Sequence, residues 1–523
     1  MGERDPQAPL WSYRVNLDKR VRREHPLRRI NGVLDLGFVR EQVAHTYGRR
    51  GNKSVPPEVI LRMMLLLFLD DIKSERELMR VISERLDYMW FLGYGLDDEI
   101  PDHSVLSKAR KRWGQEVFVT LFSRVVHQCL EAGLVEGSKI HVDASLVDAN
   151  ASLHSVKPLE AEVAAAIRHT AQEQLQKLDE QDDDQEPPSD AGDKGAPVGE
   201  VGKFYKANRQ FRSKTDPDAT LVRQGGLKSR PRYKTHRVVD DAYEIITAVE
   251  TTTGAVDEGQ RLLDLIQAHE DVTQQEVEIV IADSRYGTTR NLIGCQAQGV
   301  RPHLAVLAET QATAGRRDKI YPERMFVYQP RNNTYLCPAG GIMPPRRCHP
   351  KRLTWEYVTT KGTCLLCHLR VLCTRSKSGR TIHRHRDQSL LDRAKREAAS
   401  RAAVIDLKRR QHLMERSFAD ATNCHGFKRA RWRGLWKQAI QDLLIATAQN
   451  LRKLVKKLVD YLTLANPEIA RRLRKLVSAL TAPLSPPPEF VLRLKPSIWT
   501  GMRSDDAPKF ASIGQRPVKL PET

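Results

Sequence analysis

The sequence predicts an α/β protein in which a mixed-sheet core follows an N-terminal helical domain and is interrupted by a Cys-rich insertion. Three observations support this fold class. The spacing of apolar residues changes from helical to strand-like at Lys139. Strand patterns then alternate with helical segments. Five of the 8 cysteines lie in one short stretch. The chain of 523 residues is also too long for one compact domain, because a domain has roughly 150 residues.

The charge balance favours a polyanionic partner. Lys and Arg number 85 against 65 Asp and Glu, which gives a net charge of +20. The hydrophobic fraction of 40% excludes a wholly disordered chain. The longest apolar run, Val59–Leu69, contains Arg62 and is far shorter than the roughly 20 residues a bilayer requires. We therefore expect a soluble cytosolic protein whose partner is a nucleic acid.

Residues 1–29 form an N-terminal arm, and residues 30–133 are predicted to be helical. Pro56 and Pro57 open an apolar helix, and Ser74 precedes Glu77 at capping-box spacing. The last predicted helices include Ser104–Trp113, whose cations suit contact with phosphates: Lys108, Arg110, Lys111 and Arg112. A solvated helical face explains the same charges equally well.

Residues 134–309 are predicted to be the first part of the mixed-sheet core. The patterns KIHVDASLV, HRVVDD, EIITAVETTTG and VEIVIADS indicate strands. Helical segments at Gln260–His269 and Thr289–Gln298 alternate with them. Residues 176–200 are acidic and rich in Pro and Gly, so we expect a disordered surface insertion there.

Residues 310–385 form the Cys-rich, zinc-ribbon-like insertion. Cys364 and Cys367 make a CxxC pair, with Cys337 before it and Cys373 after it. In a reducing cytosol, four such thiols suit tetrahedral Zn²⁺ better than a disulfide or a redox pair. A metal-free cysteine cluster is the alternative, and Cys348 is a spare thiol.

Residues 386–465 are predicted to complete the core with one long helical region, Ser389 to Leu464, and residues 466–523 to form a poorly ordered tail. Nine basic residues and one acid lie between Lys428 and Lys457, which is a pattern typical of contact with a nucleic-acid backbone. Trp432 and Trp436 lie among these cations. Stacking on an unpaired base is one interpretation of these rings, and inward packing is the more ordinary one.

Two aspartates follow strand patterns, Asp143 after KIHV and Asp283 after EIVIA. Ligands of open α/β sheets gather at that edge, although either aspartate alone is more often a cap or a turn former. Glu415 is a third candidate, because it is a carboxylate on an otherwise basic helix. Taken alone, it could simply pair with Arg410 or Arg416.

The segments around these three acids resemble insertion-sequence transposases of the DDE class, closest to the eleven-eighty-two group. The resemblance is carried by VDASLVDANAS, VIADSRYGTTRNL and MERSFADATNCHGFKRARWRGL, in that order, and extends over roughly residues 30–460. TDPDA and the helical segment GNKSVPPEVILRMMLLLFL also recur in that family. The sequence departs from it at Thr422, where many relatives place a Lys. Relatives of the neighbouring insertion-sequence group also have Tyr and Arg where this sequence has Lys408 and Gln411.

The resemblance implies an RNase H-like fold in which Asp143, Asp283 and Glu415 hold two Mg²⁺ (or Mn²⁺) ions. It also implies a bacterial, cytoplasmic and nucleoid-associated enzyme that binds the terminal inverted repeats of its own element as a homodimer or higher oligomer, cleaves double-stranded DNA and joins it to a target. Two metals stabilise the attacking and the leaving oxygen of a phosphodiester. We expect these cations to contact DNA near the catalytic residues: Arg416, Lys428, Arg429, Arg431 and Arg433.

Two other functions are compatible with the sequence. An inactive, domesticated descendant would bind DNA without cutting it, and Thr422 slightly favours that reading. A zinc-bearing nuclease of host DNA metabolism would not need specific ends. We expect residues 30–130 to choose the element ends, unless they serve only dimerisation through Val59–Leu69.

Overall fold

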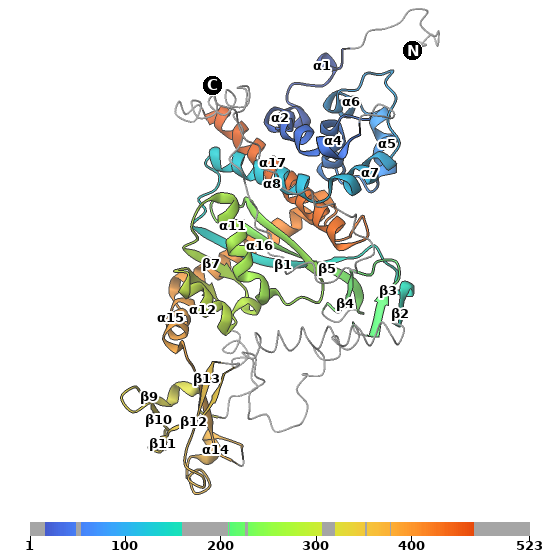
Figure 1. Cartoon of the computed structure of the whole chain (residues 1–523). Helices are drawn as coiled ribbons and strands as arrows, with labels where there is room; N and C mark the ends of the chain where they lie inside the picture. The colour runs from blue at the N-terminus through green and yellow to red at the C-terminus, as the bar shows by residue number, and fades with distance from the viewer. Residues whose placement is uncertain are drawn as a thin grey trace, which may run out of the picture. The chain divides into compact units, whose positions relative to one another are not determined.

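The computed structural model describes residues 16–48, 54–158, 208, 210–224, 228–305, 320–350, 353–376 and 378–464 (Figure 1). Residues 1–15 of the predicted arm, the predicted insertion at 176–200 and the predicted tail at 466–523 lie outside these ranges. Of the described helices, none is long and apolar enough to cross a bilayer.

The N-terminal region is helical, as the sequence predicts. Pro57 opens its most apolar helix, which is buried along nearly its whole length. The Ser74 side chain accepts a hydrogen bond from the backbone N–H of Glu77, so this serine caps the next helix. The helices of the region are α1 (Leu17–Arg20), α2 (Pro26–Val33), α3 (Gly37–Val43), α4 (Pro57–Leu69), α5 (Glu75–Glu84), α6 (Leu86–Leu92), α7 (Ser104–Trp113) and α8 (Glu116–Glu131).

A mixed sheet of six strands forms the centre of the fold. Its order is β4-β5-β1-β7-β8, with β6 also paired to β5. The pairs of β5 with β1, β4 and β6 are antiparallel, whereas β1–β7 and β7–β8 are parallel. The predicted strand patterns are confirmed. The strands are β1 (Lys139–Asp148), β4 (Thr220–Val222), β5 (Arg230–Asp240), β6 (Ile246–Thr253), β7 (Ile279–Ala282) and β8 (Arg301–Leu304).

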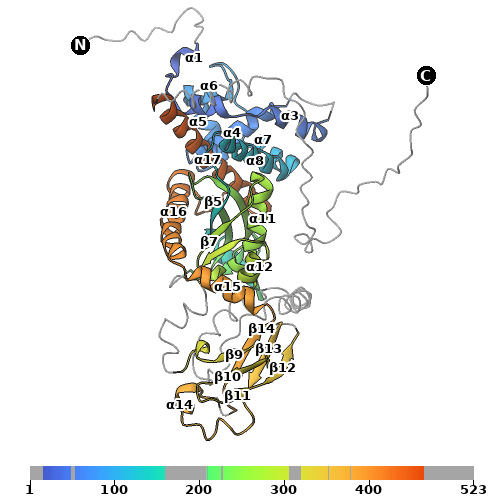
Figure 2. The same ribbon diagram turned by 90° about the vertical axis from the view of Figure 1, so that its left-hand side faces the viewer.

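Helices cover both faces of this sheet (Figure 2). On one side α11 (Leu262–Thr273) and α12 (Thr289–Ala297) share an apolar core with Ile140 and Val142 of β1. On the other side α16 (Arg401–His425) packs against β1, β7 and β8. The side chains of β1 alternate between the two faces, so Asp143 lies on the face of α16.

The predicted long helix from Ser389 to Leu464 is three helices. They are α15 (Gln388–Ala398), α16, and α17 (Leu435–Leu464). Gly426 ends α16 with a φ of 65°, and Gly434 precedes α17 with a φ of 100°. Both angles lie in the region that favours glycine, so these two residues turn the chain between α16 and α17.

The N-terminal helices share one apolar core with α17. This core joins Leu65 of α4 and Val126 of α8 to Leu444 and Leu451 of α17, and it continues to Tyr233 of the sheet. The structure therefore gives residues 30–133 no separate core. Amphipathic helices show which of their faces is buried, but not which element buries it.

The Cys-rich region has a small core of its own around Phe326, Tyr357 and Ile382. It contains two three-stranded antiparallel sheets and a short helix. The first sheet is β9 (Val327–Gln329), β10 (Thr334–Leu336) and β11 (Ile342–Met343), the second is β12 (Pro345–His349), β13 (Thr354–Val358) and β14 (Thr381–His385), and the helix is α14 (Arg370–Cys373). A separate pair is formed by β2 (Val156–Pro158) and β3 (Phe211–Ser213).

Candidate active site

Asp143 and Asp283 lie at the same level on neighbouring parallel strands. Strand β1 pairs with β7 with Lys139 opposite Ile279 and His141 opposite Ile281. Each of these pairs differs by 140 residues in sequence number. The same register places Asp143 opposite Asp283, and Asp283 is the first residue after β7. The carboxylate of Asp283 accepts a hydrogen bond from the N–H of Arg285 at 2.9 Å. The structure thus brings two of the three predicted acids together.

Asp143 is a half-buried carboxylate whose titration is shifted by its surroundings. Burial raises the pKa of its carboxyl to about 6, and the charges of Asp283 and Glu258 act in the same direction. Arg410 opposes them, because its guanidinium lies 3.0 Å from Asp143 Oδ2. Repulsion among neighbouring carboxylates of this kind is relieved by a bound cation, which makes the site suitable for an oxygen-preferring divalent metal.

Glu415 lies farther along α16. Asp406 pairs with Lys139 at 2.5 Å and with His303 at 2.7 Å, so α16 crosses the sheet near the start of β1. Arg410 then contacts Asp143, and Glu415 follows about 7.5 Å farther along the helix axis. The Glu415 side chain is exposed and accepts a hydrogen bond from the Gln411 amide at 3.2 Å. Within the described ranges, no three His, Cys, Asp or Glu side chains are arranged to hold a metal.

The segment between α16 and α17 runs beside the end of β1. The N–H of Asp148 donates to the carbonyl of Lys428 at 3.0 Å, and the N–H of Ala430 donates to the carbonyl of Asp148 at 2.8 Å. Lys428 Nζ reaches the Ser145 hydroxyl at 2.7 Å, two residues from Asp143. Arg429 is exposed. This pairing therefore places the exposed Arg429 at the end of β1, five residues beyond Asp143, and Lys428 within reach of Ser145.

Two of the predicted DNA-binding arginines are buried. Arg110 is 3% exposed, pairs with Glu75 and lies over the ring of Trp432 at 3.8 Å. Arg431 pairs with Asp71 at 2.9 Å and donates to carbonyls of the α4 end. Both guanidiniums are engaged within the protein, Arg110 fully and Arg431 with about one tenth of its side chain exposed, so these two are poorer candidates for DNA contact than the exposed cations.

The other predicted cations are accessible. Arg416 pairs with Glu244 and is 64% exposed at its side chain. These remaining side chains are also exposed: Lys108, Lys111, Arg112, Lys428, Arg429 and Arg433. Trp432 meets Phe68 edge-on at 5.8 Å, which supports inward packing rather than base stacking for that ring.

Helix α17 is a core helix and not a basic surface. Its residues from Gln438 to Leu451 are buried, and the acid within this stretch, Asp442, is 0% exposed. Burial also lowers the pKa of Lys453 to about 8, and the ammonium donates to the Glu244 carbonyl. The nine basic residues predicted as one footprint are therefore divided between an exposed loop and a buried helix.

The TDPDA segment contributes to this core. Asp216 is fully buried and accepts hydrogen bonds from the Tyr233 hydroxyl at 2.5 Å and the Gly434 N–H at 3.0 Å. Asp218 accepts from the N–H of Leu435 at 2.9 Å. Both carboxylates therefore satisfy backbone donors at the start of α17, and they do not reach the Asp143 side of the site.

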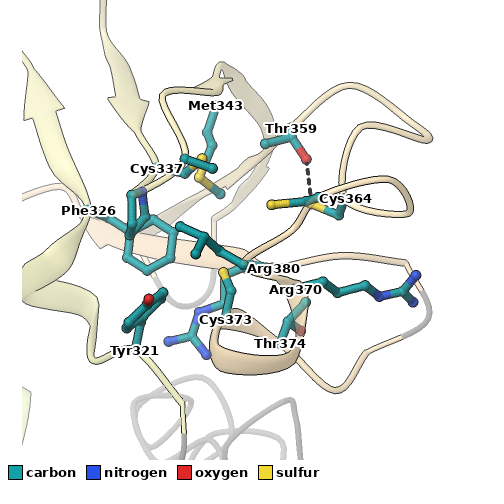
Figure 3. Close-up of a pocket in the computed structure, with 14 residues that line it drawn as sticks. Tyr321, Phe326, Cys337, Met343, Thr359, Cys364, Arg370, Cys373, Thr374 and Arg380 are labelled. Atoms are coloured by element: carbon teal, nitrogen blue, oxygen red, sulfur yellow. Dashed lines mark hydrogen bonds between the residues drawn. The ribbon is translucent and has the colours of Figure 1, made fainter.

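Four cysteines surround one small pocket in the Cys-rich region. Cys337, Cys364, Cys367 and Cys373 line it together with Tyr321, Phe326 and Arg380 (Figure 3). Burial raises the pKa of Cys373 to about 11, and the three other thiols act in the same direction. Cys348 is exposed and is not among the residues of the pocket.

One acid near the site was missed. Glu258 follows β6 and raises the pKa of Asp143, so it lies within electrostatic range of the site. Its signal in the sequence is the same as that of the two aspartates, a carboxylate just beyond a strand pattern. The turn TTGAVDEG conceals it, because Asp257 next to it is an equally good turn residue.

Two family models match this chain. Residues 15–112 match the transposase domain family DUF772, and residues 336–455 match the transposase DDE domain family. Both matched families are transposase domains. They support a DDE transposase, and a DDE domain implies nuclease and transposition activity. The first range covers α1 to α7, and the second includes the cysteine pocket, α16 and Glu415, whereas Asp143 and Asp283 lie outside both.

The chain was also compared with curated proteins and with solved structures. No curated protein matches it. A solved structure, the piggyBac transposase synaptic complex with hairpin DNA, is 9% identical and aligns over 92% of this chain and 91% of that chain, with a TM-score of 0.29. A TM-score this low does not establish a common fold. The similarity of this chain to transposases therefore rests on the two family models.

Proposed function

We propose that this protein is the transposase of an insertion sequence of the eleven-eighty-two group, which binds the terminal inverted repeats, cleaves them and joins them to target DNA. The observation that carries the proposal is the placement of Asp143, within β1, level with Asp283, which directly follows the parallel strand β7. The strand order supports an RNase H-like core: the antiparallel strands β6, β5 and β1 are followed by the parallel strands β7 and β8.

The proposed site would hold two Mg²⁺ ions on Asp143, Asp283 and Glu415. Such ions supply a charge that stabilises the attacking and the leaving oxygen at the phosphorus. The chain contributes the rest of the site. Arg410 orients the Asp143 carboxylate through their 3.0 Å ion pair. Lys428 and Arg429 lie where a DNA phosphate next to the scissile bond would meet them, which fixes the strand without choosing its sequence.

The same proposal extends to assembly and location. Both ends of an element must be held together for transposition, so we expect a homodimer or a larger assembly on DNA in the bacterial cytoplasm, associated with the nucleoid. The exposed cations of α7 are a second surface for DNA. Residues 30–130 remain our candidate for the choice of the ends.

The test is cleavage of labelled element ends. The DNA flanking the gene supplies the substrate, as a pair of inverted repeats. Wild-type protein should nick these ends with Mg²⁺, and Asp143→Ala should bind them without nicking. Binding without cleavage by the wild type would favour the inactive DNA-binding protein instead. The exposed position of Glu415 is the observation that keeps this second function in view.

We also propose that the four pocket cysteines hold one Zn²⁺. The space around the sulfurs supports this. The Gly341 N–H donates to Cys337 Sγ at 3.2 Å, and a Cβ at Gly379 would lie 2.9 Å from Cys364 Sγ. Elemental analysis should find about one zinc per chain, as four thiolates would bind. Cys364→Ser should lose it, whereas Cys348→Ser should retain it. A wild-type protein free of zinc would contradict the proposal.

A further inference from the structure

Glu258 lies in a short turn, η3 (Glu258–Arg261), between β6 and α11. Glu258 is 7% exposed, and its carboxylate pairs with Arg285 Nη1 at 3.0 Å and with Lys234 Nζ at 3.2 Å. Arg285 is the second residue after Asp283. A buried carboxylate is therefore tied directly to the loop that carries one of the proposed metal ligands.

The two loops are locked together by three independent contacts. Besides the pair of Glu258 with Arg285, the Asn291 amide donates to the carbonyl of Gly259 at 2.7 Å and to the carbonyl of Tyr286 at 2.9 Å. A Cβ at Gly259 would lie 2.7 Å from the carbonyl of Arg285, so only glycine allows this close approach. Glu258 is thus held at a fixed place relative to Asp283.

A buried hydroxyl adjoins the same acids. Tyr286 is 0% exposed, and its hydroxyl has no hydrogen-bond partner in the described part of the chain. Burial raises the pKa of this phenol, and the charges of Glu258, Asp143 and Asp283 raise it further. The hydroxyl is therefore an unused donor within range of three carboxylates. A buried donor without a partner is costly, so it is expected to serve a group that the site binds.

We propose that Glu258 is a fourth acidic side chain of this site and acts as a positioning residue. It fixes the Asp283 loop level with Asp143, so that these carboxylates are held ready for a divalent cation, while the Tyr286 hydroxyl donates to a carboxylate or water of the loaded site. The inference rests on the proposed function for the identity of the site. Carboxylates that repel one another gain most from a shared cation.

Glu250 provides a matched control. It is a half-buried carboxylate on β6, eight residues before Glu258, and it pairs with Arg261 at 2.5 Å. Glu250→Gln and Glu258→Gln remove the same charge from the same part of the fold. Only Glu258 is joined to the Asp283 loop, so only its loss should change the affinity for a cation.

The experiment is Mn²⁺ titration of the full-length protein by calorimetry, with melting temperatures measured for each variant. Glu258→Gln should raise the Kd for Mn²⁺ by about tenfold, in the range found when groups around a metal site are removed. Glu250→Gln should leave the Kd within about twofold. Glu258→Asp keeps the charge and should give an intermediate value, and it decides the matter if Glu258→Gln does not fold.

The results separate the inference from the function. Wild-type affinity in folded Glu258→Gln, or in Glu258→Asp if that is the folded variant, would overturn the role of Glu258 even if element ends are cleaved. An equal loss in Glu250→Gln would overturn it too, because the effect would then be a general one of the fold. A wild type whose Mn²⁺ affinity depends on Asp143 and Glu258 but which cleaves no DNA would instead contradict the proposed function alone.

Discussion

Asp442 of α17 is fully buried, and its surroundings determine how it titrates. Its carboxylate accepts hydrogen bonds from Thr235 at 2.7 Å, Thr251 at 2.6 Å and Gln438 at 2.9 Å. Burial nevertheless raises its pKa to about 6. The folded protein therefore binds a proton at this carboxyl more strongly than the unfolded chain does, and stability from this group falls as the pH rises from about 4 to about 6.

Asp442→Asn should remove that dependence. We expect the free energy of unfolding of this variant, measured against wild type in urea, to improve progressively between pH 4 and pH 6 and then to level off. The Gln438 amide can turn to meet the new amide, because its oxygen has no partner in the described part of the chain. The exposed Asp392→Asn should show no such trend. A constant difference between Asp442→Asn and wild type would contradict the raised pKa.

At the residue scale, strand patterns were informative and charge alone was not. Asp143 and Asp283 could be placed together because each follows an apolar strand pattern, although β1 continues past Asp143 to Asp148 and only Asp283 lies at a strand end. Arg110 and Arg431 could not be recognised as buried. The guanidinium of Arg110 is enclosed by Glu75 and Trp432, which are 35 and 322 residues away in the sequence, and no local pattern records such contacts.

At the scale of elements, the loop between α16 and α17 is the part best placed to meet DNA. Its residues 428–430 pair with Asp148 at the end of β1, which holds Arg429 in a fixed and exposed position. A cation that contacts phosphate releases counterions, so its contribution appears in the salt dependence of binding.

Arg429→Ala should weaken binding to element ends and to random duplex alike. Its slope of log K against log salt should be shallower than that of wild type by about 0.9, which is the value for one lost phosphate contact on duplex DNA. Arg396→Ala is the matched control, because Arg396 is an exposed arginine on α15. Fluorescence anisotropy at several salt concentrations measures both slopes. Equal slopes for Arg429→Ala and wild type would remove this loop from the DNA interface.

The elements themselves were largely predictable, with one informative exception. The strands and the helices α11 and α12 follow the predicted patterns, since apolar periodicity reports burial directly. The helical region predicted from Ser389 to Leu464 is interrupted twice, at residues 399–400 and at 426–434, and only the second interruption contains glycines, at 426 and 434. The basic residues of α17 suggested an exposed cationic helix. Long cationic side chains can also reach solvent from a buried helix, so their presence does not show that α17 lies on the surface.

At the scale of the whole molecule, the N-terminal helices and the sheet are stabilised by the same apolar core. Leu444 of α17 is 0% exposed and belongs to the cluster that contains α4, α8 and Tyr233 of β5. This arrangement also bears on deletions. Removal of residues 1–130 would uncover the apolar face of α17, so a loss of end recognition in that truncated chain would not by itself identify the reader of the ends.

Leu444→Ala should therefore weaken both regions together. Truncation of a buried leucine costs about 2–5 kcal/mol of unfolding free energy. We expect hydrogen exchange to accelerate in α4 and α8 as well as in β5 and β6. Leu391, which is buried in the other core with α12 and β8, provides the comparison, and Leu391→Ala should spare α4. Faster exchange confined to the N-terminal helices in Leu444→Ala would contradict a shared core.

The division of the chain was the least predictable feature. A sequence shows that α4 is apolar on nearly every side, but a dimer interface and an internal core both account for such a helix. The partner that decides between them, α17, begins 366 residues after the end of α4. Contacts over such separations leave no periodic trace in the sequence.

The central claim is that Asp143, Asp283 and Glu415 bind the divalent ions used for DNA cleavage, and cysteine substitution with a change of metal tests it most directly. Mg²⁺ prefers oxygen ligands, whereas Mn²⁺ accepts a thiolate more readily. The account predicts that Asp143→Cys, Asp283→Cys and Glu415→Cys each fail to nick element ends with Mg²⁺ and regain nicking with Mn²⁺, while Asp392→Cys nicks with either metal. A Glu415→Cys variant that nicks normally with Mg²⁺, or aspartate variants that Mn²⁺ does not restore, would contradict the account.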